Sequence, residues 1–330
     1  MRERMETYVA PVIAGLLALV TLIGLIGPAI KSPAPHDIPI GIVNAAPQML
    51  TALSGSGAFD VTSYGTEDAA RAAIDSRDLD GALVIGPSGP KLIVAGAAGD
   101  GVTGVITGVF TQMFAAQGQQ LPVEIVHPFS SGDPHGLILF FVILAILVST
   151  LISQALVGMR RRIGLPTRLS IVALFAIVSA PVAMGIAIWI AGDYGSGIWM
   201  AMAFLALGSA AVGAVVAGAA ALLGRPGIAL SAVIVVLLDL VCSGGPIGSQ
   251  LLPDAYRWLA PGMPAGQLFS AVRGSLYFDN AGITVPFGVL SLWLLGGLIL
   301  MVAGQLVSRR SKAAEPSVSG DLAPAHGADR

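Results

Sequence analysis

Long apolar runs are the feature that most constrains what this chain can fold into. A helix needs about 20 consecutive apolar residues to cross hydrocarbon about 30 Å thick, because each residue advances it by about 1.5 Å. Six segments reach or approach that length: 9–30, 136–159, 169–191, 198–223, 228–243 and 283–307. The fifth is short and needs support from the residues that follow it. The sequence therefore predicts a polytopic α-helical membrane protein with six transmembrane helices.

Composition excludes several classes of protein. The 330 residues are 55% hydrophobic and 11% charged, whereas soluble domains carry about 25% charged residues. The single cysteine, Cys242, excludes an intrachain disulfide and a zinc site built on cysteines. The chain has no GxxxxGK[ST] motif, no catalytic grouping, and no basic stripe interleaved with aromatics. We expect no enzymatic activity, no cofactor, no metal and no nucleic-acid partner.

The first apolar segment has two readings, a retained anchor or a cleaved signal peptide. Its run is about 21 residues, longer than the 7–15 of a signal core, and its exit, LIGPAIKSP, lacks a small-residue cleavage pattern. Both features favour a retained transmembrane anchor over residues 1–31.

Basic residues set the expected orientation, because short cytoplasmic loops are enriched in arginine and lysine. They fall at places that share one side if all six segments cross: Arg2, Arg4, Arg160, Arg161, Arg162, Arg168, Arg225, Arg309, Arg310 and Lys312. The loop 192–197 on the other side has no basic residue. We expect a bacterial plasma-membrane protein with both termini cytoplasmic and a disordered cytoplasmic tail over 309–330.

Residues 32–135, between the first two spans, are expected outside the cell as a small α/β domain. Short β-branched runs bounded by glycine or proline predict strands at 38–43, 59–64, 82–86, 91–96 and 123–126. A helix is predicted within 65–81, where Thr66 suits the N-cap and two acids follow it. A second helix is predicted at 103–117.

Two features within the five-helix membrane domain, residues 136–308, stand out. Ser209, Gly213 and Ala217 recur at intervals of four, and small residues at that spacing let helices approach closely. General richness in alanine and glycine explains the same pattern. Asp239 is the only acid well inside a predicted span, and such a carboxylate is costly. It is either functional or locally paired, with Arg257 or Arg273 as the expected partner.

The mixed stretch 250–277 interrupts the apolar pattern before the last span. Leu252, Tyr256 and Leu259 lie on one apolar helical face, and Phe269 and Val272 lie on a second. PGMP (261–264) separates them, and prolines end helices. The pattern predicts a broken amphipathic helix pair lying in the outer membrane interface.

The same stretch carries a family resemblance. GGPIGSQLLPDAYRWLAPGMPAGQLFSAVRG (244–274) resembles the segment before the last span in type-2 ABC exporter permeases, in particular the phage infection protein (YhgE/Pip) branch. The order of one anchor, a large outer domain that opens with IPIGIVNAAP, and five further spans also resembles that branch. The resemblance implies a permease subunit of an ABC-2-type exporter. It would form a homodimer or heterodimer in the lipid membrane and move a hydrophobic or amphipathic substrate outward with a separate cytoplasmic ATPase.

One departure from that family leaves a second function open. The loop that engages the ATPase in type-2 permeases is usually longer and contains acids, whereas here it is short and basic, with Arg160, Arg161, Arg162 and Arg168. If an ATPase does bind, these four residues are the expected coupling loop. The alternative is a non-transporting envelope receptor, scaffold or assembly protein that acts through its outer domain.

Overall fold

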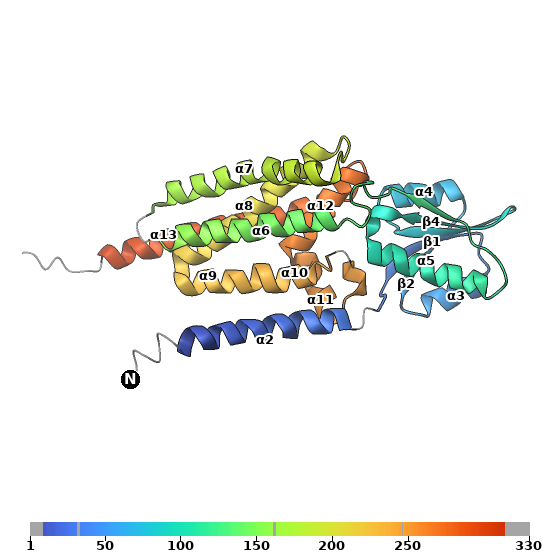
Figure 1. Cartoon of the computed structure of the whole chain (residues 1–330), viewed down its shortest axis with the longest axis horizontal. Coiled ribbons are helices and arrows are strands. Elements are labelled where there is room, and N and C mark those ends of the chain that lie inside the picture. The colour runs from blue at the N-terminus through green and yellow to red at the C-terminus, as the bar shows by residue number, and fades with distance from the viewer. Residues whose placement is uncertain (1–8, 32–33, 161–162, 246, 314–330) are drawn as a thin grey trace, which may run out of the picture.

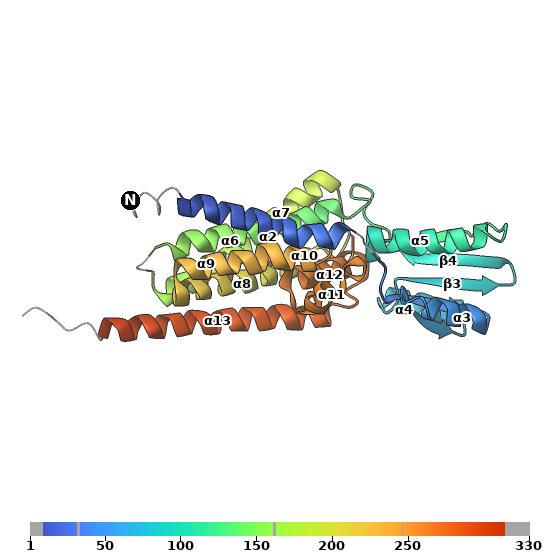
Figure 2. The same cartoon turned by 90° about the horizontal axis from the view of Figure 1, so that it is seen from below.

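The computed structural model describes residues 9–31, 34–160, 163–245 and 247–313. A helical bundle forms one part, and a small α/β domain lies at one end of it (Figure 1). The long helices run side by side along the bundle axis in both views (Figures 1 and 2). The chain therefore separates its apolar helices from its sheet along the length of the molecule.

Four helices are long and apolar enough to cross a membrane within the part of the chain that is described. They are α6 (Leu137–Gly158), α7 (Leu165–Ala191), α8 (Ile198–Leu223) and α13 (Thr284–Ala313), the last counted over Thr284–Val307. This is the organisation of a multi-pass membrane protein. α13 continues six residues past its predicted end at residue 307, and the tail 314–330 lies outside the described residues.

The other two predicted spans are also helical. α2 (Ala10–Lys31) has 22 residues, the same length as α6. The fifth predicted span is α9 (Arg225–Ala232), a π-helical segment (Val233–Leu238) and α10 (Asp239–Cys242). Its π turns, which are wider than α turns, lie directly before Asp239.

α8 is the central helix of the bundle and contacts α6, α7, α9, α12 and α13. Its small residues make those contacts close. Gly208 faces Leu268 of α12, Gly213 faces Thr150 of α6, and Gly218 faces the backbone of α13. Larger side chains at these positions would push the neighbouring helices away.

The α/β domain is a five-stranded mixed sheet of order β2-β1-β3-β4-β5. The strands are β1 (Ile38–Val43), β2 (Phe59–Tyr64), β3 (Gly81–Gly86), β4 (Gly89–Ala95) and β5 (Val123–Val126). Only the β3–β4 pair is antiparallel. All five predicted strands are therefore confirmed, with ends shifted by at most two residues.

Helices cover both faces of this sheet. α3 (Pro47–Ser54) and α5 (Asp100–Ala115) pack on one face, and α4 (Glu67–Asp75) packs on the other. The Thr66 hydroxyl accepts a hydrogen bond from the Ala69 N–H, which confirms the predicted N-cap. α3 was not predicted. Two residues from the other part of the chain complete the two cores: Leu251 on the α5 side and Phe278 on the α4 side.

The stretch 250–277 folds as the predicted broken pair, α11 (Asp254–Leu259) and α12 (Pro264–Tyr277), joined by the 3₁₀ turn Ala260–Gly262. Its surroundings differ from the expected interfacial position. α12 packs against α8, α13, α6 and α10, so protein covers it on most sides. The reason is that buried small residues such as Ala265 and Ala271 allow close packing, and Leu268 of α12 faces Gly208 of α8.

Candidate functional site

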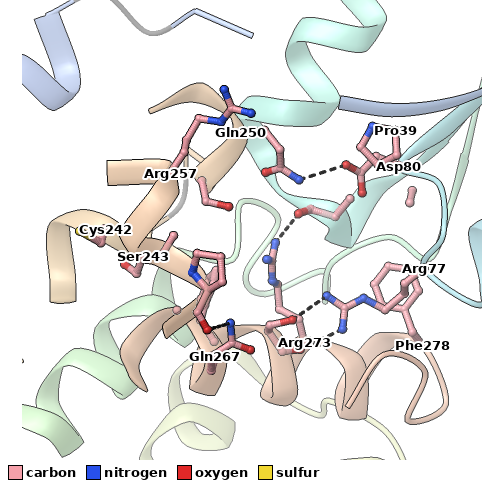
Figure 3. A pocket seen from close by; sticks show the side chains of 18 of the residues that line it. Pro39, Arg77, Asp80, Cys242, Ser243, Gln250, Arg257, Gln267, Arg273 and Phe278 are labelled. Carbon is pink, nitrogen blue, oxygen red and sulfur yellow. Dashed lines mark hydrogen bonds between the residues drawn. The ribbon is translucent and has the colours of Figure 1, made fainter. Parts of the chain in front are cut away.

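A polar cavity of about 360 Å³ lies where the α/β domain meets the α11–α12 pair (Figure 3). We call it the junction pocket. On the domain side it is lined by the loop between α4 and β3 and by the short turn Gly96–Ala98. On the bundle side α11, α12 and the turn Ser249–Leu251 line it. Its charged and amide side chains are Arg77, Asp80, Gln250, Arg257, Gln267 and Arg273.

Arg77 reaches the pocket from the end of α4. Its backbone is left-handed, with φ of 66°, at a place where glycine usually ends a helix. That conformation costs a non-glycine residue about 1–2 kcal/mol. Contacts with the bundle offset the cost: the guanidinium donates to the Ser270 carbonyl at 3.0 Å and to its hydroxyl at 3.1 Å. Arg77 thereby ties the α/β domain to α12.

Arg273 reaches the pocket from α12 in the opposite direction. Its guanidinium donates to the carbonyls of Ala97 and Ala98 and stacks over the Phe269 ring at 4.6 Å. The Nε atom is buried and donates to no group among the described residues. Burial and the neighbouring Arg77 charge lower the pKa of Arg273 to about 9. Keeping Arg273 charged in this position therefore costs free energy, because it has lost hydration and lies near a second positive charge.

Asp80 faces the two arginines from the start of β3. Its carboxylate accepts a hydrogen bond from the Gln250 amide at 3.3 Å. Burial raises the pKa of Asp80 to about 6, although the charges of Arg273 and Arg77 act to lower it. Neither arginine forms a salt bridge with a carboxylate in the part of the chain that the structure describes. The centre of the pocket thus holds two arginine cations and one carboxyl group, Asp80, whose pKa of about 6 is close to neutral pH.

Arg257 also lines the pocket, but its charge is compensated. It forms salt bridges with Asp37, just before β1, and with Asp254, one turn earlier on α11. The prediction that Arg257 or Arg273 pairs with Asp239 is therefore wrong. Both arginines point toward the α/β domain, because acids and free carbonyls lie there.

Asp239 instead holds the N-terminus of α12. Both of its carboxylate oxygens accept from the Ala265 backbone N–H, at 2.8 and 2.9 Å, and the side chain is fully buried. The first turn of a helix has N–H groups without partners inside the helix, so a carboxylate there supplies a missing acceptor. Asp239 is a cap supplied by a neighbouring helix.

The remaining residues of the predicted interfacial pair are divided between two environments. Leu252, Phe269 and Val272 are buried, whereas Tyr256 and Leu259 are partly buried. The Tyr256 hydroxyl donates to the Leu25 carbonyl of α2 at 2.8 Å. The pair therefore links the first helix, the bundle and the α/β domain.

The predicted packing residues Ser209, Gly213 and Ala217 are all buried on α8. Ser209 shares a hydrogen bond of 2.9 Å with Thr150 of α6. One turn further along α6, Gln154 is fully buried and its amide has no partner among the described residues. This region holds the bundle together and lies away from the charged pocket.

The ends of α6 and α7 that flank the basic loop lie at the opposite end of the bundle from the junction pocket (Figure 1). Arg160 is exposed, and Arg161 and Arg162 lie outside the described residues. Arg168 is 9% exposed and donates from Nε to the Ile163 carbonyl at 3.3 Å. Of this loop, the structure therefore places one exposed arginine and one that closes the start of α7.

A second cavity, of about 660 Å³, lies between α6 and α7. Its lining is apolar except for Ser149 and Ser179. The two cavities thus differ in chemistry, one charged and one suited to hydrocarbon.

Sequence reasoning missed Arg77 and Asp80 as site residues. Arg77 lies 193 residues from its α12 partner Ser270, and Asp80 lies 170 residues from its partner Gln250, so no local spacing indicates either contact. Residues 77–80 follow the end of a helix, and arginine rather than glycine at position 77 is the one signal available.

Comparisons with known proteins give no relative: no family model, no curated protein and no solved structure matches this chain. No cluster of three metal-ligating side chains occurs among the residues described. The candidate site therefore has to be interpreted from its own geometry.

Proposed function

We propose that this chain is the membrane permease subunit of an ABC-2-type exporter that moves a hydrophobic or amphipathic substrate outward with a separate ATPase. One observation carries the proposal. α12 packs beside α8 in the bundle and, with α11 and the α/β domain, lines a charged pocket at one end of the membrane helices. An amphipathic molecule combines the two chemistries that the two cavities offer separately. Its charged group suits the junction pocket, and its tail suits the apolar cavity between α6 and α7.

The proposal includes six spans, with α2 and the α9–α10 segment as the first and fifth. α2 lies alongside the segment α9–α10 and contacts it (Figure 2). The first turn of α2 and the last turn of α13 lie at the end of the bundle that is far from the α/β domain (Figure 1). The last turn of α6, two residues before Arg160, and the first turn of α9, which begins at Arg225, lie at that same end, which favours a cytoplasmic position for it. The α/β domain is then outside.

Tryptophans support a membrane boundary near the junction pocket. Trp189, Trp199 and Trp258 are 83%, 80% and 84% exposed. They lie at the last turn of α7, the first turn of α8 and on α11, all at the domain end of the bundle. Tryptophan is enriched where hydrocarbon meets water. We therefore place the outer interface at this level.

Purification of the tagged full chain from native membranes tests the exporter function. An ATPase with a phosphate-binding loop should co-purify, and replacing Arg160 with glutamine should weaken that association. The matched control is Arg225→Gln, which removes an exposed charge at the same end of the bundle from the first turn of α9. Absence of an ATPase from every preparation would count against the exporter.

One observation favours the alternative of a non-transporting envelope receptor or scaffold. Only residues 159–164 connect α6 to α7, so this loop offers little surface to an ATPase. In that case the α/β domain would be the functional surface, and deleting it should abolish partner binding without affecting membrane insertion.

A further inference from the structure

We propose that the junction pocket binds a phosphate-class oxyanion between Arg77 and Arg273. The inference concerns binding alone, so it stands whether or not the chain transports. It rests on the charge balance of the pocket, on its donors and on its position.

Charge balance is the first argument. Arg77 and Arg273 approach one cavity from two different parts of the chain, and each bonds to neutral backbone carbonyls. Buried cations that lack an ionic partner are costly, because carbonyls replace only part of their hydration. The other charges facing the cavity are Asp80, which forms no salt bridge with either arginine among the described residues, and Arg257, which Asp37 and Asp254 neutralise. A bound anion would supply the missing partner.

Donor geometry is the second argument. The Arg273 side chain lines the cavity without a salt bridge to any described carboxylate, and its Nε–H, which is buried away from the open space, has no acceptor among the described residues. Ser249 also lines the cavity with a hydroxyl group, and Gln267 lines it with an amide that donates one hydrogen bond to the Pro261 carbonyl at 3.0 Å. In Figure 3, Arg77, Asp80 and Arg273 surround the same space from different elements. Several donors that converge from different directions suit a phosphate, which presents several acceptor oxygens, better than a planar carboxylate.

Size and position are the third argument. A cavity of about 360 Å³ accommodates a phosphate with a small substituent, but not a nucleotide with its base and an additional tail. The pocket lies at the level of the exposed tryptophans, where lipid headgroups would lie if the bundle spans a membrane. The phosphate can therefore come from a lipid headgroup or from a free phosphate in water.

The experiment uses the purified full chain in a non-ionic detergent, with thermal unfolding as the readout. Three probes are titrated: a water-soluble short-chain phosphatidylglycerol, the phosphatidylcholine of the same chain length, and inorganic phosphate. We expect phosphatidylglycerol to raise the melting temperature more than phosphatidylcholine does. Arg273→Gln should weaken its apparent affinity by about tenfold, as expected for the loss of one charge-assisted hydrogen bond.

Arg225→Gln is the matched control, because it removes one exposed positive charge at the far end of the bundle. Its affinity for the probe should equal that of the wild type. Asp80→Asn removes the negative charge that faces the bound anion, so it should tighten binding at pH 7. This second variant decides the matter if Arg273→Gln does not fold.

The outcomes separate the sources. Selective binding of phosphatidylglycerol supports a lipid headgroup, and equal binding of inorganic phosphate with the same Arg273 dependence supports a free oxyanion. Failure of both anionic probes to bind overturns the proposal. An identical loss in Arg273→Gln and Arg225→Gln, or unchanged affinity in Asp80→Asn, also overturns it.

Discussion

Two buried carboxylates in this chain serve helix starts. Asp133 accepts hydrogen bonds from the Ile138 and Leu139 N–H groups at the start of α6, a few residues further along the chain. Asp239 does the same for α12 from a different helix. A cap supplied by another helix accepts the free N–H group of the capped helix and also joins the two helices. Asp239 therefore fixes where α12 enters the bundle.

Replacing Asp239 tests this capping role. We expect Asp239→Ala to lower the free energy of unfolding by about 1–2 kcal/mol, because the Ala265 N–H loses its acceptor. Asp239→Asn keeps an acceptor oxygen and should be milder. Thermal unfolding in detergent measures both. The control is Asp193→Ala, which removes a similar bond to Gly195 in an exposed loop. If Asp239→Ala and Asp193→Ala lowered the free energy of unfolding equally, the capping role of Asp239 would be refuted.

Asp80 predicts a pH dependence of stability. Its pKa is raised from 3.8 to about 6 in the folded chain. The folded state therefore binds more protons than the unfolded state between about pH 4 and pH 6, and stability falls as the pH rises through that window. Relative to the wild type, Asp80→Asn should gain about 1–3 kcal/mol between pH 4 and pH 7. Chemical unfolding at several pH values measures the difference, with Asp60→Asn, an exposed carboxyl on β2, as control. A difference that does not vary with pH would contradict this.

At the scale of elements, the contact between α8 and α13 depends on glycines. A methyl group added at Gly297 would lie 2.5 Å from the Ala214 carbonyl carbon, and one added at Gly218 would lie 2.8 Å from the Gly297 oxygen. Backbone atoms cannot move aside as a flexible side chain can. The two helices are therefore as close as their backbones allow.

Gly297→Ala should separate these helices and lower the melting temperature by several degrees, corresponding to about 1–3 kcal/mol for overpacking. The adjacent Gly296 is a matched control, since a methyl group there meets nothing within 4 Å. Gly296→Ala should be neutral or stabilising, because alanine is the better helix former. Similar effects at both positions would show that the close contact contributes little.

Elements with strong local signals could be predicted from the sequence, and those defined by remote contacts could not. The β-branched runs predict the strands, and Thr66 followed by two acids predicts the start of α4. α3 was missed because its N-cap, Ala46, makes no side-chain bond and the helix has eight residues. The burial of α12 was missed because small residues such as Ala271 do not reveal that α8 covers them. The junction pocket joins segments nearly 200 residues apart, so no pattern in one segment indicates it.

At the scale of the whole molecule, the two ends of the bundle differ in chemistry. The domain end carries the exposed tryptophans and the junction pocket, and the other end carries Arg160 and Arg225. This polarity is the basis for proposing that the α/β domain lies outside the cell.

Cysteine labelling tests the orientation. In a Cys242→Ser background, a cysteine at Ser88, between β3 and β4, should react with a membrane-impermeant maleimide in intact cells. A cysteine at Arg160 should react only after permeabilisation. The reversed pattern would place the domain inside.

The completion of the domain core by Leu251 and Phe278 has a consequence for biosynthesis. The ribosome finishes β5 roughly 125–150 residues before it makes these two side chains, which at 5–20 residues per second is a delay of about 6–30 s. During that interval the nascent domain exposes two unfilled apolar sites. Nascent chains halted before residue 251 should therefore be more sensitive to protease in this domain than chains that extend past residue 278, so its maturation is timed by the emergence of the α11–α12 pair.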